Sequence, residues 1–119
     1  MILLYDGTFE GFLSLVYEVY YKKLKPTKIY KTLPNEILFE EILEINSSKE
    51  SGIKVLNAIK TKFPKEILEK ILNIFMCDSK EFEMALLEYI VIGLTDLKQL
   101  YNINYACVFY LNNIEKELF

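Results

Sequence analysis

The chain has 119 residues, of which 52% are hydrophobic and 14% aromatic, and its net charge is -3. This length predicts a single domain over residues 1–119, and so apolar a composition excludes a disordered chain. The sequence contains no histidine, tryptophan or arginine. Without histidine it lacks the commonest general base and metal ligand, and without arginine it lacks the bidentate phosphate contact. No enzyme class is assigned; the missing residue types favour a non-catalytic protein without metal or cofactor.

No stretch of the sequence predicts a membrane span or a secretion signal. The most apolar window, residues 84–94, is too short to cross a bilayer and contains Glu88, and the apolar run at the amino-terminus has no basic leader. Cys77 and Cys107 match neither a zinc spacing nor a redox spacing. We therefore expect reduced thiols in a cytoplasmic protein that does not contact a membrane.

The first two dozen residues form the element around which we expect the chain to fold. An apolar run over Ile2–Tyr5, ended by Asp6 and Gly7, predicts a short buried strand and a turn. Asp6 or Thr8 is placed to cap a helix that then runs to the lysines before Pro26. Its predicted inward face repeats at the helical spacing and comprises Phe9, Phe12, Leu13, Val16, Tyr17 and Tyr20.

Two further strands are predicted after this helix. Residues 26–35 form a connector with a short extended piece at Ile29–Tyr30. Residues 36–45 fit a strand or a helix; we favour a strand over about Glu40–Ile45, because the first strand needs a partner. If the two strands are neighbours, the helix between them makes a parallel, right-handed crossover.

The remainder of the chain is predicted to be helical. A capping box at Ser47–Glu50 opens a helix, Pro64 opens the next, and Asp78–Ser79 ends it before an almost wholly apolar helix over Lys80–Gly93. The first of these helices places Ile53, Leu56, Ile59 and Phe63 on one face. A last helix over Thr95–Phe119 carries a seam of Leu100, Ile103, Cys107, Tyr110 and Ile114.

The predicted fold class is therefore α+β and predominantly α-helical. It has about five helices and a small two- or three-stranded sheet, formed by the amino-terminal strand and residues near 40–45.

Positive charge is concentrated near the amino-terminus. Residues 1–31 hold five lysines and three acids, whereas the rest holds nine lysines and fourteen acids. Lysines contact phosphates and exposed tyrosines stack on unpaired bases, although such a run is also typical of a solvated helix end and loop. The candidate nucleic-acid-binding residues are Lys22, Lys23, Lys25, Lys28, Lys31 and Tyr30.

Two other sets of residues invite a functional interpretation. Gly7, Gly11, Ser14 and Glu18 form a line of mostly small residues that would admit a ligand or another backbone, and internal packing is the favoured explanation. The carboxylates of Glu40, Glu41 and Glu44 could hold magnesium or work as acid and base, but a solvated face explains them better.

The segment Tyr5-Asp-Gly-Thr-Phe-Glu-Gly-Phe-Leu13 resembles a bacterial family of DNA metabolism or repair proteins. Members are typically encoded beside a radical-SAM protein related to spore photoproduct lyase, and related domains are fused to uracil-DNA-glycosylase-type domains. The motif residues in this chain are Asp6, Gly7, Phe9 and Gly11. Weaker likeness continues in order through Leu38-Phe39, residues 41–45, the helix over 47–59, and Leu86–Gly93.

The chain departs from this family in two respects. The resemblance covers the family's amino-terminal half, because members continue past the last helix with basic and histidine-containing segments. Glu88 and Val91 stand where arginine is expected. The resemblance implies an accessory module that contacts DNA and acts with the radical-SAM partner. The alternative is a protein–protein interaction module without nucleic-acid contact, a shortened relative of the family.

A second apolar stripe on the last helix predicts a homodimer. Tyr105, Val108, Phe109 and Leu118 lie outside the seam, and a twofold contact would cover them. The alternative is that both stripes are buried within one chain.

Overall fold

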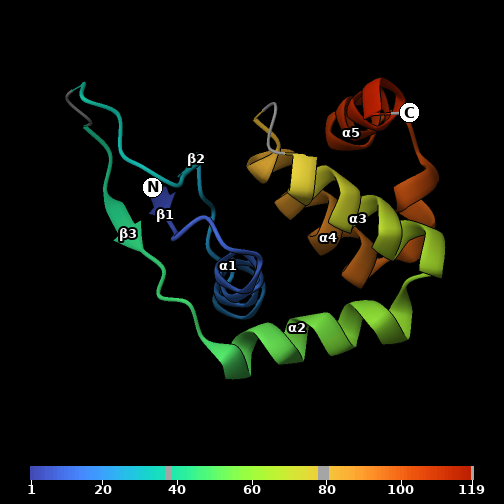
Figure 1. Cartoon of the computed structure of the whole chain (residues 1–119), viewed down its shortest axis with the longest axis horizontal. Coiled ribbons are helices and arrows are strands. Elements are labelled where there is room, and N and C mark those ends of the chain that lie inside the picture. The colour runs from blue at the N-terminus through green and yellow to red at the C-terminus, as the bar shows by residue number, and fades with distance from the viewer. Residues whose placement is uncertain (37–38, 78–80, 119) are drawn as a thin grey trace. The chain divides into compact units, whose positions relative to one another are not determined.

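The structure, a computed structural model, describes residues 1–36, 39–77 and 81–118, without the side chain of Leu118. Its elements are β1 (Ile2–Leu4), α1 (Phe9–Lys22), β2 (Lys28–Tyr30), β3 (Ile42–Glu44), α2 (Lys49–Lys62), α3 (Lys65–Cys77), α4 (Glu83–Thr95), the 3-10 helix η1 (Leu97–Tyr101) and α5 (Ala106–Leu118) (Figure 1). The predicted class, α+β and mainly helical, is confirmed. The predictions made for Leu38, Asp78–Ser79, Lys80 and Phe119 lie outside the described residues.

The chain divides into two compact units, Met1–Leu56 and Asn57–Phe119. Unit 1 contains the three strands, α1 and the first half of α2. Unit 2 contains the second half of α2 and the helices that follow it. The single domain predicted from the chain length stays a prediction.

Unit 1 is built on a small parallel sheet in the order β2-β1-β3. Leu3 in the central strand is paired with Ile29 on one side and with Leu43 on the other, and both pairings are parallel. Figure 1 shows β1 between its two neighbours, with α1 beside them. The strand predicted near residues 40–45 and the short extended piece at Ile29–Tyr30 are both confirmed.

One face of the sheet packs on α1. The ring of Tyr5, which directly follows β1, meets the ring of Phe12 edge to face with 5.9 Å between the centroids. Side chains two residues apart in a strand share a face, so Leu3 lies on the same side as Tyr5. Leu3, Phe12 and Val16 are completely buried. This interface is the core of unit 1.

α1 is buried over a wider arc than the apolar spacing predicted. Besides its apolar residues, Gly11 and Ser14 are buried, while Tyr17 and Tyr20 are only half-buried. The hydroxyl of Ser14 accepts the N–H of Ser48 at 2.8 Å, just before α2 begins. The predicted inward face was therefore partly wrong, because α1 also packs its small polar side against the start of α2.

The start of α2 corrects a second prediction. Ser48, not Ser47, caps this helix: its side-chain oxygen accepts the N–H of Ser51 at 3.2 Å. The hydroxyl of Ser47 instead donates to the Glu10 carboxylate at 2.8 Å. Further along α2, Ile53 is exposed and Val55 is buried, so the inward face is rotated from the predicted one.

Unit 2 is organised around α4, which contacts both η1 and α5. Gly93 in α4 lies under Phe63 and Leu100, and a Cβ built at this glycine would lie 2.7 Å from a side-chain carbon of each. Leu86 and Ile90 of the same helix are completely buried. α4 corresponds to the almost wholly apolar helix predicted over Lys80–Gly93, of which Lys80 lies outside the described residues.

The single last helix predicted over Thr95–Phe119 is wrong, because the chain breaks it after η1. The Asn102 side chain accepts the N–H of Asn104 at 3.0 Å in the connection, and α5 begins only at Ala106. The break shifts the helical phase. Ile103 and Tyr110 of the predicted seam are therefore exposed, and Val108, placed outside the seam, is buried.

Candidate nucleic-acid interface

The family-motif residues of unit 1 form a relay of hydrogen bonds at the start of α1. The Asp6 carboxylate accepts the N–H and the hydroxyl of Thr8 at 2.9 and 2.6 Å. The Thr8 oxygen in turn accepts the N–H of Gly11 at 2.9 Å and so caps the helix. The two bonds from Thr8 hold the pKa of Asp6 below its ordinary value, because they favour the charged carboxylate.

Both glycines of the motif are required by this turn. Gly7 has a φ of 84°, which side chains rarely adopt, and a Cβ at Gly11 would lie 2.1 Å from the Asp6 carboxylate oxygen. Phe9 is the first residue of α1. The motif is thus accounted for by local folding, and the packing explanation of the small-residue line is confirmed for Gly11 and Ser14.

The candidate lysines follow in sequence where α1 ends. The Lys22 ammonium is 2.6 Å from the Glu18 carboxylate, so its charge is already paired. Lys23 ends the helix in the left-handed conformation, with φ of 53°, and its N–H is bonded to the Val19 carbonyl. Lys23, Lys25 and Lys28 are exposed, and none is in an ion pair with a described residue. These three are the cations available to a ligand.

Tyr30 and Lys31 lie at the opposite end of β2 from these lysines. The extended chain carries Lys31 roughly 10 Å beyond Lys28. Its side chain covers the turn at Gly7, where a built Cβ would lie 3.2 Å from the Lys31 Cδ. Tyr30 is half-buried, and its carbonyl accepts the N–H of Tyr5 at 3.0 Å. The length of β2 thus separates Tyr30 and Lys31 from the other candidate residues.

Tyrosines on α1 supply an exposed aromatic surface; of the three tyrosines that the sequence interleaves with the lysines, Tyr20 and Tyr21 belong to it and Tyr30 does not. The rings of Tyr17 and Tyr21 have centroids 4.5 Å apart, and Tyr20 meets Tyr21 edge to face. Tyr21 is 62% exposed. The ammonium of Lys54, from α2, lies 5.8 Å from the Tyr17 ring centroid. We call residues 17–28 the tyrosine–lysine segment.

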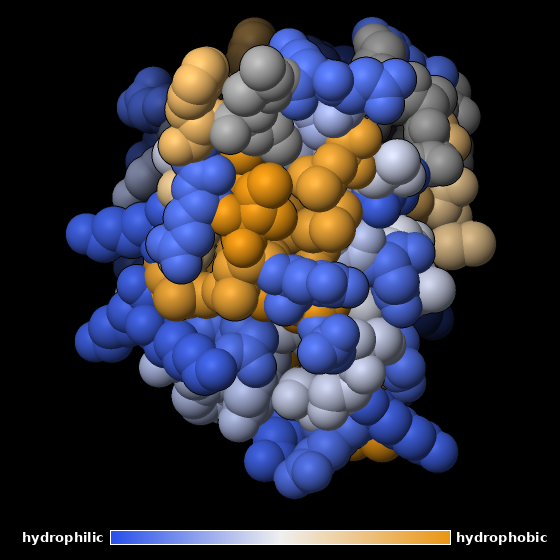
Figure 2. Space-filling view, turned by 90° about the vertical axis from the view of Figure 1, so that its left-hand side faces the viewer, coloured by the Kyte–Doolittle hydropathy of each residue, from blue (hydrophilic) through white to orange (hydrophobic). Residues whose placement is uncertain are grey.

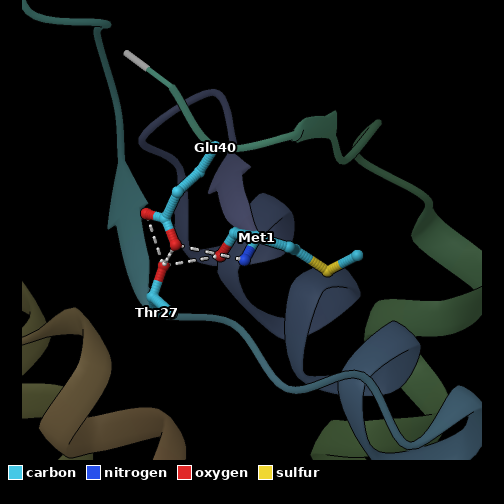
Figure 3. Close-up of polar contacts among 3 residues, drawn as sticks. All are labelled: Met1, Thr27 and Glu40. Atoms are coloured by element: carbon cyan, nitrogen blue, oxygen red, sulfur yellow. Dashed lines mark hydrogen bonds and ion pairs between the residues drawn. The ribbon is translucent and has the colours of Figure 1, made fainter.

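The acidic residues are exposed, and Glu40 also makes polar contacts. The Thr27 hydroxyl is 2.9 Å from each oxygen of the Glu40 carboxylate and 3.0 Å from the Met1 carbonyl, and the Met1 amine is 3.5 Å from Glu40 (Figure 3). Glu40 therefore ties together the amino ends of the strands, while its side chain stays exposed to solvent, as predicted. Glu41 and Glu44 are exposed. The described residues contain no group of three or more potential metal ligands.

Unit 2 contains a half-buried cation, Lys70, that sequence reasoning missed. Lys70 of α3 contacts the Asn112 side-chain oxygen, its ammonium is 3.9 Å from Glu115, and it lies 5.1 Å from the Tyr89 ring centroid. Burial lowers the pKa of Lys70, and the nearby Glu115 carboxylate partly opposes this shift. Burial also raises the pKa of Tyr89. In the sequence, Lys70 lies beside the apolar stripe of its helix, and nothing in that pattern predicts its contacts with residues of other helices.

The residues predicted to form a dimer interface do not share one surface. Val108 is 1% exposed and belongs to the core of unit 2, whereas Phe109 is 57% exposed and Tyr105 is also exposed. The side chain of Leu118 lies outside the described part of the structure. Val108 was therefore wrongly assigned to an exposed stripe, because the helical phase was extrapolated through the break before α5.

No protein-family model, curated protein or solved structure matches the chain. The likeness to the DNA-metabolism family therefore stays a prediction from the motif residues. Among the described helices, none is long and apolar enough to cross a membrane.

The contact of Asp6 with Gly11 predicts a specific pattern of coupling. Gly11→Ala alone should destabilise the protein by about 1–3 kcal/mol, because the new methyl group overlaps the carboxylate. Asp6→Ala alone should cost about 1 kcal/mol through loss of the relay that orients the cap. In the double variant, Gly11→Ala should cost much less, since the overlapping group is gone. Urea unfolding of the four proteins measures the coupling, and strictly additive losses would contradict this geometry.

Because Lys70 is partly buried, removing its charge should raise the free energy of unfolding by an amount that depends on pH. Its folded-state pKa lies below the unfolded value, so the charged form is penalised in the folded protein. The penalty is complete below the folded-state pKa and is lost as the pH rises towards the unfolded one. Lys70→Met should therefore raise the free energy of unfolding by about 1 kcal/mol at neutral pH. The gain should shrink towards about pH 10.

Urea unfolding at both pH values, with the exposed Lys60→Met as the matched control, measures this effect. An effect of Lys70→Met that is equal at both pH values would show that burial of the charge is not its cause.

Proposed function

We propose that the protein is an accessory, non-catalytic module of DNA metabolism or repair that contacts nucleic acid through the tyrosine–lysine segment. The observation that supports this proposal is an exposed tyrosine ring beside a second tyrosine ring, followed by lysines that make no ion pair with a described residue. Tyr21 is exposed beside Tyr17, and Lys23, Lys25 and Lys28 follow it without ion pairs to described residues.

The chemistry of this segment suits a single strand better than a duplex. Tyrosine rings stack on the faces of bases, which a duplex hides and a single strand exposes. Lysines act as point charges on phosphates and do not read base edges as arginine does. The segment should therefore bind single-stranded nucleic acid with little dependence on sequence.

The family resemblance supplies the context of the proposal. It implies a module that acts in DNA metabolism beside a radical-SAM partner, and the cysteine content predicts a cytoplasmic location. The Cys107 thiol is buried and in its reduced form, which fits such a reducing compartment. Local folding accounts for the motif that carries the resemblance, so the partner would be recognised by other surfaces.

Binding of a labelled oligothymidine, followed by fluorescence anisotropy against salt, tests the nucleic-acid proposal. The triple variant Lys23→Gln, Lys25→Gln, Lys28→Gln should weaken binding and reduce the salt slope by roughly 0.7 for each phosphate that is no longer neutralised. Tyr21→Ala should weaken binding by about 1–3 kcal/mol for a stacked base, with little change in that slope.

The matched control is the triple variant Lys60→Gln, Lys62→Gln, Lys98→Gln, which removes the same charge from exposed lysines elsewhere. An equal loss of affinity in the control would show that only the net charge of the protein, and not the position of these lysines, affects binding. Absence of binding at low salt would end the proposal.

A second candidate function is protein–protein interaction without nucleic acid, and the exposed apolar residues of unit 2 favour it. Ile103, Tyr105 and Phe109 are exposed near the start of α5, and Phe109 lies one helical turn after Tyr105. A twofold contact between two copies would cover such a surface. We propose this homodimer as the alternative to binding the radical-SAM partner there.

Sedimentation equilibrium at micromolar concentration tests the homodimer. The mass of two chains should fall to that of one in Phe109→Lys, because a charge would be buried at the contact. Met76→Lys, at an exposed position of α3, is the control and should remain dimeric. A wild-type protein with the mass of one chain would exclude the dimer.

A further inference from the structure

The outer edge of β3 presents unused backbone groups. The Ile2 N–H donates to the Glu41 carbonyl and the Ile45 N–H donates to the Leu4 carbonyl, both at 2.7 Å. Residues 41, 43 and 45 therefore turn their backbone groups towards β1. Because these groups alternate sides along a strand, those of Ile42 and Glu44 point away from the sheet. In the described sheet, β3 has a neighbour on one side only.

The two edges of this sheet carry opposite charges. β2 begins with Lys28 and is preceded by Lys25 and Pro26, features that discourage pairing with another chain. Residues 36–44, which include β3, contain four glutamates and no lysine. Glu40 is bound to Thr27 and Met1, but Glu41 and Glu44 are exposed and have no ion pair with a described residue. The β3 edge is therefore complementary to a cationic partner.

Exposed apolar side chains accompany this edge. Ile42 is 41% exposed within β3, and Phe39, three residues earlier, is 95% exposed. Figure 2, which views the molecule from the left-hand side of Figure 1, shows a patch of apolar residues with hydrophilic residues along part of its border. Charged side chains alone are enough to prevent an edge strand from pairing with other chains. Exposed apolar side chains at such an edge therefore indicate an interaction site.

We propose that the β3 edge binds an extended, basic peptide segment of another protein as a fourth strand. The backbone groups of Ile42 and Glu44 bond to the main chain of that segment. Its apolar side chains lie on the face of Ile42, and its lysine or arginine side chains lie on the opposite face, against Glu41. The proposal is independent of nucleic-acid binding, since it uses none of the tyrosine–lysine segment.

The probe is a fluorescent, acetylated and amidated peptide of about seven alternating lysine and valine residues, long enough to pair with one strand. Its binding to the full chain is measured by anisotropy, and protection of the Ile42 and Glu44 amide protons by NMR hydrogen exchange. A glutamate–valine peptide and a lysine–valine peptide with a central proline serve as matched probes. The lysine–valine peptide should bind and protect both amides, and the other two should not.

Ile42→Lys should weaken binding at least about tenfold, because it places a like charge against the probe and removes its apolar contact. Ile53→Lys adds the same charge at a position of α2 that is 46% exposed, and should change little. Glu44→Pro removes one outward N–H without touching the bonds to β1, and should also weaken binding while the β1–β3 pairing persists. Lys23, Lys25 and Lys28 variants should bind the peptide normally.

Three results would overturn the proposal. Equal binding of the proline-containing peptide would show attraction by charge without strand addition. Equal losses in Ile42→Lys and Ile53→Lys would place the contact elsewhere. Protection of the Ile42 and Glu44 amides that rises with protein concentration in the absence of peptide would make a second copy of the chain the occupant.

Discussion

The carboxylate of Asp6 occupies the space that a side chain at Gly11 would fill, and the organisation of unit 1 depends on this close approach. With the carboxylate in this place, Thr8 is oriented to cap α1, and the helix starts directly after the turn. α1 then presents Phe12 to the sheet and Ser14 to the start of α2. One short-range contact thus sets the direction of the helix that joins every other part of the unit.

The sequence was sufficient for elements whose signals are local. The apolar run before Asp6-Gly7 predicted β1, and the need of that strand for partners predicted β3 from an ambiguous segment. The last helix could not be predicted in the same way. Asn102 bonds to the chain two residues ahead, and this competing turn is as compatible with the local composition as a continuous helix. Beyond it, Cys107 and Ile114 of the predicted seam are buried, but Tyr110 is exposed and Val108 is buried, contrary to the predicted phase.

The candidate site shows the same division between local and distant information. The cations Lys23, Lys25 and Lys28 were found because they are close in sequence, and composition alone marks them. Tyr20 and Tyr21, which the sequence also places among these lysines, lie near the end of α1, whereas Tyr30 lies at the far end of β2. Lys70 was missed because its neighbours Tyr89 and Glu115 come from two other helices. The spacing of residues within one helix does not predict contacts between different helices.

The position of β1 in the middle of a wholly parallel sheet has a consequence for the route of folding. Ile2 pairs with Lys28 and with Ile42, which lie 26 and 40 positions further along the chain. Neither pairing can be nucleated by a hairpin, so each requires closure of a long loop before any bond of the ladder forms. Unit 2 makes contacts between residues that are closer in sequence, such as that of Phe75 in α3 with Phe82, which directly precedes α4. We therefore expect the helices of unit 2 to associate early, and the threading of β1 between its two distant partners to limit the rate at which unit 1 reaches its native state.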